Sequence, residues 1–232
     1  MNNVPVYRKT GSYHLLNGLQ SQDVVWQAES NTAKICAIAD GVSACENGKR
    51  GAEIACESAS RVMLDETEYM FSASEGKVAN LLSSYIRQKL AEEAAIYNNR
   101  LESYASTLSF VCYNKLSGEV MTFVLGDSLI YLVEQGSMTL CGAPRVSYDG
   151  MTYTTTTKNV ADVVDIKISQ KSDVKFLLAT DGAWKTFYSG DSGSLSFEML
   201  QAVKENDIAG YLENQRCADD CSVIMMDIPK GV

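Results

Sequence analysis

Residues 177–187 read LLATDGAWKTF, and this stretch decides how the chain is interpreted. The apolar run 176–179 has the composition of a buried strand, and it stops abruptly at Thr180, Asp181 and Gly182. One Asp-Gly pair after a strand is ordinary turn chemistry and says little by itself. The same arrangement recurs along the chain, however, and the recurrence needs a physical reason.

Acidic residues stand at the rim of three further apolar segments. Asp40 follows the segment 33–39, Asp127 follows FVLG, and the pair Asp219-Asp220 directly precedes CSVIMMDI. Neighbouring strands lie about 5 Å apart in a sheet and packed sheets about 10 Å apart, so acids at one rim can converge. For any one of these residues, a role as a turn cap is the simpler interpretation. For four sites together, we expect convergence.

Converging carboxylates repel one another and lose hydration, which is unfavourable unless a cation compensates. Oxygen ligands without His or Cys favour the hard ions Mg²⁺ and Mn²⁺. Gly41 and Gly182, which follow Asp40 and Asp181, would let the backbone turn tightly beside such an ion and expose a carbonyl as a ligand. The pattern therefore predicts a metal site built from aspartates.

Composition limits the classes of protein that fit. The 232 residues, 46% of them apolar, contain no low-complexity linker, so we expect a single domain over 1–232. A net charge of −9 argues against nucleic acid or an anionic membrane as partner. No apolar run reaches the length of a membrane span, and the N-terminus does not resemble a secretory signal. Seven cysteines without a CxxC pair indicate a reducing, cytoplasmic setting.

The order of expected elements indicates the fold class. Period-3.6 apolar patterns predict helices, and short β-rich runs between turn signals predict strands joined by connections too short for helical crossovers. Neighbouring strands should therefore be antiparallel. Strands and helices come in blocks, which favours antiparallel sheets flanked by helices over a doubly wound parallel sheet. The expected helices are 51–64, 76–101 and 196–204, the strands 33–39, 106–113, 120–125, 129–133, 174–179 and 221–228, and the loop 145–165.

These segments also carry a resemblance to a known family. The ordered series ADG (39–41), STLSFV (106–111), GDS (126–128), LLATDGAW (177–184) and ADDCSVIM (218–225) resembles the metal-dependent protein phosphatases of type 2C. LLATDG and GDS are its most specific parts. The resemblance implies an α/β (α+β) four-layer sandwich, in which two packed antiparallel sheets lie between helices. It also implies two Mg²⁺ or Mn²⁺ ions at one edge of the sandwich.

The resemblance implies a role for each matching acid. Asp40 would bridge the two ions, with the Gly41 carbonyl on one of them, and Asp181 and Asp219 would bind the other. Asp127 would help to hold a third, weaker ion. Asp220 stands where the family usually has Asn, and we expect it, like Asp23, to lie just behind the ligands.

The N-terminal segment departs from the family pattern. Where relatives have Arg followed four residues later by Glu-Asp, this chain has Gly18 and then Gln22-Asp23. Gln22 can offer only a neutral oxygen to an ion, and the arginine that would bind phosphate is missing. A bacterial branch of the family carries a similar His…Gly…Gln-Asp segment. The single histidine, His14, would then contact phosphate or protonate the leaving oxygen; the alternative is a partly buried loop histidine.

The function implied by the resemblance is a metal-dependent serine/threonine protein phosphatase, in which a water activated at the binuclear centre hydrolyses a phosphomonoester. The alternative is a degenerate module that binds phosphoprotein or metal without turnover. The expected partner is a phosphorylated protein, such as the product of a bacterial Ser/Thr kinase, and the protein is expected to act as a monomer. The Thr-rich segment 145–165 matches the position of the family's flap, where substrates would be selected. It could equally be a plain surface loop.

Overall fold

The computed structural model describes residues 5–142, 144–189 and 193–230. Within these residues ten strands form two antiparallel five-stranded sheets. The first sheet runs in the order β1 (Val6–Lys9), β10 (Cys221–Ile228), β9 (Val174–Ala179), β6 (Leu129–Glu134) and β7 (Ser137–Leu140). The second runs in the order β2 (Asp23–Glu29), β3 (Ala33–Asp40), β4 (Leu108–Asn114), β5 (Glu119–Leu125) and β8 (Asp165–Gln170).

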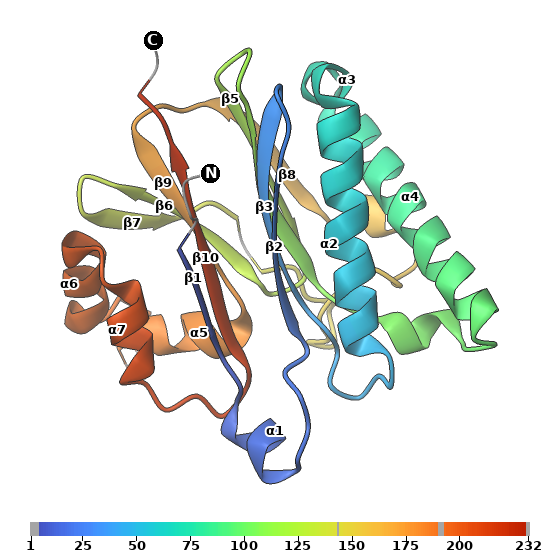
Figure 1. Cartoon of the computed structure of the whole chain (residues 1–232), viewed down its shortest axis with the longest axis horizontal. Helices are drawn as coiled ribbons and strands as arrows, with labels where there is room; N and C mark the ends of the chain where they lie inside the picture. Colours follow the sequence, from blue (N-terminus) through green and yellow to red (C-terminus); the bar gives the residue numbers. More distant parts are fainter. Residues whose placement is uncertain (1–4, 143, 190–192, 231–232) are drawn as a thin grey trace.

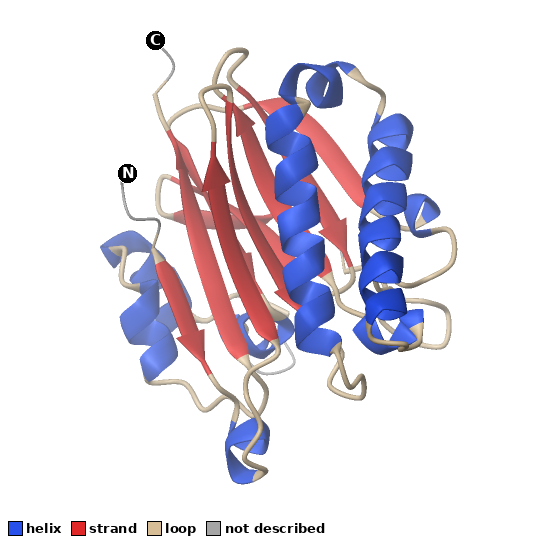
Figure 2. Ribbon diagram, turned by 45° about the vertical axis from the view of Figure 1, so that its right-hand side comes forward, coloured by secondary structure: helices blue, strands red, loops and turns tan. Residues whose placement is uncertain are grey.

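Helices cover both outer faces of the sandwich (Figures 1 and 2). The long helices α2 (Gly48–Asp65) and α4 (Glu75–Ile96) pack on the second sheet, and α6 (Phe197–Glu205) and α7 (Ile208–Glu213) pack on the first. Three short helices complete the described set: α1 (Ser12–Leu16), α3 (Thr67–Ser72) and α5 (Asp181–Trp184). The predicted four-layer arrangement is confirmed.

The interior consists of three apolar layers, and β3 shows why. Its residues Ile35 and Ala37 pack against α2 and α4, whereas the alternate residues Cys36 and Ile38 pack between the two sheets. All four are fully buried. A strand covered on both faces needs apolar side chains at every position, which explains why AKICAIA reads as a continuous apolar run.

Two sequence-based expectations about elements were wrong in part. The helix expected over 76–101 ends at Ile96, because Asn98 takes a left-handed conformation (φ 54°) and the Asn99 N–H donates to the Ala94 carbonyl. The expected strands 120–125 and 129–133 are not antiparallel neighbours. They belong to different sheets: β5 pairs with β4 and β8, and β6 with β7 and β9.

The crossing between the sheets occurs at Gly126. Its φ of 94° is open to glycine but strained for other residues, and an added Cβ would lie 2.7 Å from the Thr107 side chain. The chain can therefore leave one sheet and enter the other within three residues. This crossing carries Asp127 to the edge of the sandwich where β3 and β9 end.

The segment 145–165 contains little regular structure, as predicted. Within it the structure has a bridge between Val146 and Thr152 and a short 3₁₀ turn at Val160–Asp162. It is nevertheless tied to the body of the protein, since the Thr155 N–H donates to the Ser106 carbonyl at 2.8 Å. In the described part of the chain, no helix combines the length and apolar character needed to cross a membrane.

Candidate metal centre

Asp40 and Asp23 stand side by side where β3 ends and β2 begins. They are direct partners in the antiparallel register of these strands. The Asp40 backbone is fixed from the next strand as well: its N–H donates to the Thr107 hydroxyl at 2.9 Å, and the Thr107 N–H donates to its carbonyl at 2.8 Å. Pairing on both sides places the two carboxyl groups at one rim of the second sheet.

The first sheet brings Asp181 and the Asp219-Asp220 turn to the same rim. β9 ends just before Asp181, and the antiparallel strand β10 begins just after Asp220. The two turns touch through their backbones, since a Cβ on Gly182 would lie 2.0 Å from the Asp220 carbonyl oxygen. Gly41 is equally constrained, with 2.4 Å between such a Cβ and the Gly48 backbone. Neither glycine has a positive φ, so close approach, and not the tight turn expected from sequence, requires them.

A buried hydrogen-bond chain joins the rims of the two sheets. The Thr180 hydroxyl, in the first sheet, donates to Asp23 Oδ2, in the second, at 2.8 Å. The same hydroxyl oxygen accepts from the Ser222 N–H at 3.0 Å. Sequence reasoning did not single out Thr180; its place directly before Asp181 was the available signal.

The pKa values of the acids follow from their convergence. Burial raises the pKa of Asp40 well above its usual value, and the negative charges of four further acids raise it more: Asp23, Asp181, Asp219 and Asp127. Burial likewise raises the pKa of Asp23 to about 7, even though the Thr180 hydroxyl donates to its carboxylate. The structure therefore brings together the aspartates that the sequence placed at strand ends.

These acids fit a divalent cation. Asp181 Oδ1 and Asp23 Oδ1 are buried and have no hydrogen-bond partner among the described residues. Buried carboxylate oxygens without a donor are unfavourable, and a hard cation is the partner that suits several of them at once. The predicted Mg²⁺ or Mn²⁺ therefore matches the donor set of this rim.

Asp220 anchors the N-terminal segment against this rim. Its carboxylate accepts from the Gly11 N–H at 2.9 Å and the Gln22 N–H at 2.8 Å, and lies 2.8 Å from His14 Nδ1. Burial tends to raise the pKa of Asp220, but these contacts outweigh it and lower the pKa. His14 is 2% exposed, and one ligand atom each from His14, Asp219 and Asp220 lie within 4.8 Å of one another. The lone histidine is thus part of the rim.

The Gln22 side chain lies against the backbone of the Asp40 turn. The carbonyl oxygens of Gly41 and Val42 are 2.7 and 3.2 Å from its amide nitrogen when that nitrogen is directed at them, and only the NH₂ group can donate to a carbonyl. In this arrangement Gln22 supports the Gly41 carbonyl. Its role as a direct ligand stays a prediction.

Asp127 is held by two side chains. The Trp184 indole N–H donates to its backbone carbonyl at 2.7 Å, and the Thr152 hydroxyl donates to its carboxylate at 3.0 Å. Trp184 is partly buried, packs against the core of the first sheet, and fixes the position of the Asp127 backbone. Thr152 links the same acid to the segment 145–165.

Comparison with known families agrees with this geometry. Residues 10–215 match the family described as protein phosphatase 2C. The chain belongs to this family. By family and fold it is a serine/threonine protein phosphatase. Comparison with curated protein sequences finds no match.

Solved structures share the fold of this phosphatase at low sequence identity. The serine/threonine phosphatase of S. agalactiae has a TM-score of 0.67 at 14% identity, covering 97% of this chain and 99% of that one. The Mycobacterium tuberculosis phosphatase PstP/Ppp has a TM-score of 0.67 at 14% identity, covering 98% of both chains. RsbX in complex with magnesium has a TM-score of 0.58 at 15% identity, covering 97% and 98%.

A cleft of about 670 Å³ opens beside the rim of the phosphatase. One wall is the turn 41–45 after Asp40, and the other is formed by the segment 145–165, including Met151 and Tyr153. Asp40 and Asp127 lie in its lining. The cleft therefore connects the acidic rim with the segment 145–165, for which the sequence left a flap and a plain surface loop as alternatives.

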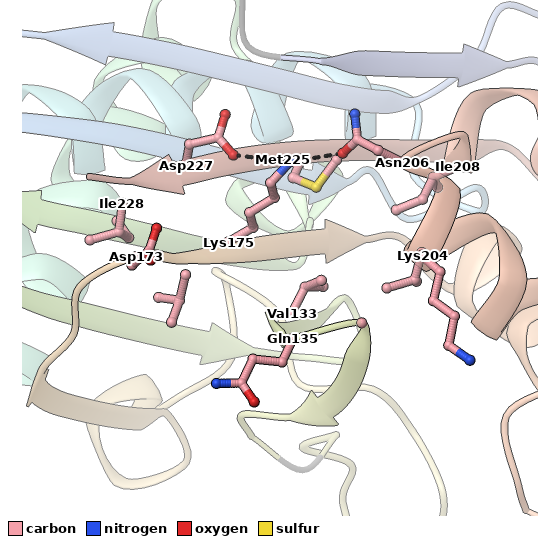
Figure 3. A pocket seen from close by; sticks show the side chains of 13 residues that line it. Val133, Gln135, Asp173, Lys175, Lys204, Asn206, Ile208, Met225, Asp227 and Ile228 are labelled. Atoms are coloured by element: carbon pink, nitrogen blue, oxygen red, sulfur yellow. Dashed lines mark hydrogen bonds and ion pairs between the residues drawn. The ribbon is translucent and has the colours of Figure 1, made fainter. Parts of the chain in front are cut away.

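A second cavity, of about 350 Å³, lies at the opposite end of β9 and β10 (Figure 3). In it, Lys175 donates to Asn206 at 2.8 Å and pairs with Asp227 at 3.5 Å. These polar groups interact with one another, and the cavity lies one strand length away from Asp181. This cavity is therefore separate from the acidic rim.

Proposed function

We propose that this phosphatase uses Mg²⁺ or Mn²⁺ held by Asp40, Asp181 and Asp219, with the Gly41 carbonyl as a further ligand. The observation that carries the proposal is the convergence of Asp40 with four further acids at one rim of the sandwich; burial and the charges of these acids raise the pKa of Asp40. A cation would relieve this repulsion and supply partners for the unpaired carboxylate oxygens. The magnesium in the RsbX structure supports the choice of ion. Two ions at this rim, with a third near Asp127, remain part of the proposal.

The bound ions would activate a water as nucleophile and neutralise charge on the phosphoryl group. The residues of the chain position this chemistry. Thr107 fixes Asp40, Trp184 fixes Asp127, and Asp220 holds His14 and the backbone of Gln22 against the rim. His14 would serve the phosphate or the leaving oxygen from its buried position beside Asp220.

The proposed substrate is a phosphoserine or phosphothreonine protein, such as the product of a bacterial Ser/Thr kinase. Its polypeptide would lie in the cleft between the turn 41–45 and the flap 145–165. The Thr152–Asp127 hydrogen bond couples the flap to the rim, which supports a role of the flap in substrate selection. We further propose a single-domain monomer in a reducing cytoplasm, a setting that the seven free cysteines support.

The proposal is tested by hydrolysis of p-nitrophenyl phosphate and a phosphothreonine peptide with titrated Mn²⁺. We expect metal-dependent turnover that Asp181→Asn abolishes, because the substitution removes charge with little change of shape. Asp173→Asn is the matched control, since this acid is 67% exposed and lies at the other end of β9. Tight phosphopeptide binding without turnover at any metal concentration would instead favour a degenerate binding module. Equal activity of both variants would refute the proposed ligand set.

A further inference from the structure

Lys185 places a cation among the acids of the rim. Its ammonium nitrogen lies 2.6 Å from Asp181 Oδ2, four residues earlier in the chain. The charges of Asp181, Asp127 and Asp219 all act on this ammonium group. Asp181 and Lys185 are four residues apart on a helical turn, and this i,i+4 spacing brings their side chains together.

The acidic rim creates a need for such a cation. A phosphate monoester approaches as an anion, and the arginine expected from the family pattern is replaced by Gly18. Gly18 has no side chain, and nothing lies within 4 Å of the position where its Cβ would be. A positive side chain at the rim would take the place of this arginine, in addition to the ions and His14.

Lys185 is free to change partner. Its side chain is 59% exposed, whereas the Asp181 carboxylate is 13% exposed, so most of the lysine side chain stays open to solvent and to a ligand. The lysine side chain has a flexible four-carbon stem, and its ammonium group carries three N–H donors that suit phosphoryl oxygens. Its neighbour Trp184 is fixed to Asp127, and the Lys185 ammonium lies 5.9 Å from the centre of the Trp184 ring. The backbone of Lys185 is thus held in place next to Trp184, whereas its ammonium group can take another rotamer.

We propose that Lys185 is the phosphate-binding cation of this phosphatase. When Asp181 binds a divalent ion, the ammonium group leaves that carboxylate and donates to the phosphoryl oxygens of the substrate. The proposal rests on the proposed function, since it requires a metal at Asp181. In the substrate-free protein, Lys185 would also compete with the metal for Asp181. Removal of its charge should therefore weaken phosphate binding and strengthen metal binding.

The test uses Lys185→Met, which keeps the length of the stem and removes the charge. We expect the KM for the phosphothreonine peptide and the inhibition constant of inorganic phosphate to rise about tenfold, the loss of one charge-assisted hydrogen bond. Mn²⁺ affinity, measured by calorimetry without substrate, should rise several-fold because the competing ammonium is gone. Lys185→Arg should restore most of the phosphate affinity.

Lys167→Met is the matched control, because this lysine is also 59% exposed and pairs with an acid, Asp165, at 3.7 Å. It should change none of the three: the KM, the inhibition constant of phosphate or the Mn²⁺ affinity. Metal-dependent turnover in the unmodified protein with an unchanged KM in Lys185→Met would refute the role of Lys185 and leave the proposed function standing. Absence of turnover in the unmodified protein would refute the proposed function itself. Weaker Mn²⁺ binding in Lys185→Met would also overturn the inference, because it would make Lys185 a support of the ligand set.

Discussion

Asp220→Ala should loosen the N-terminal segment that carries His14 and Gln22. The Asp220 carboxylate accepts two backbone N–H groups, from Gly11 and Gln22, and lies 2.8 Å from His14 Nδ1. The Gly11 hydrogen bond is buried, and that to Gln22 is partly buried. Removal of the carboxylate leaves these donors without their acceptor at the rim.

The magnitude follows from the number of bonds lost. Hydrogen bonds to a charged group contribute about 1.5–3 kcal/mol each, so two of them contribute about 3–6 kcal/mol. We expect the lower end, because water can reach the Gln22 N–H once the carboxylate is gone. In a domain of this size 1 kcal/mol corresponds to about 2–4 °C, which predicts a fall in Tm on the order of 10 °C.

Thermal unfolding followed by circular dichroism, without metal, measures this loss. Asp220→Asn keeps one acceptor oxygen and should lose about half as much. Asp227→Ala is the control, since this acid on the same strand is 62% exposed, and such surface substitutions usually change stability by less than about 0.5 kcal/mol. Equal melting temperatures for Asp220→Ala and Asp227→Ala would show that Asp220 does not anchor the segment.

Three further predictions concern the rim. Asp181→Asn should weaken Mn²⁺ binding in calorimetry, and an unchanged affinity would mean that Asp181 is a turn residue. Gln22→Glu should lower the Mn²⁺ concentration for half-maximal p-nitrophenyl phosphate hydrolysis, because a charged ligand holds the ion more strongly; no shift would exclude Gln22 from the ligand set. Burial raises the pKa of Asp23 to about 7, so the folded state holds an extra proton below that pH. The stability of the metal-free protein should therefore fall as the pH rises from about 4 to 7. Urea titrations of Asp23→Asn should show a smaller dependence, and Asp40, whose pKa is also raised, should supply the remainder.

The sequence by itself determined the fold class and the acids of the rim. Buried strands require apolar runs, and the carboxylates that follow them stand out against that background. The sequence alone therefore identified AKICAIA and FLLAT as buried strands, and Asp40 and Asp181 as the acids that follow them. Because the β-strand period and the turn residues are local properties, the expected strands lie within a few residues of β3, β4, β5, β6, β9 and β10. The strands β1, β2, β7 and β8 were not expected from the sequence.

Only the tertiary structure decided which strands pair and what surrounds each acid. The strands 120–125 and 129–133 are adjacent in sequence yet lie in different sheets, because Gly126 turns the chain across the sandwich. Thr180 contacts Asp23 across 157 residues of sequence, and Lys185 reaches Asp181 among acids from both sheets. Such contacts depend on how segments far apart in the sequence pack together. This packing results from many weak interactions, which leave no pattern in the local sequence.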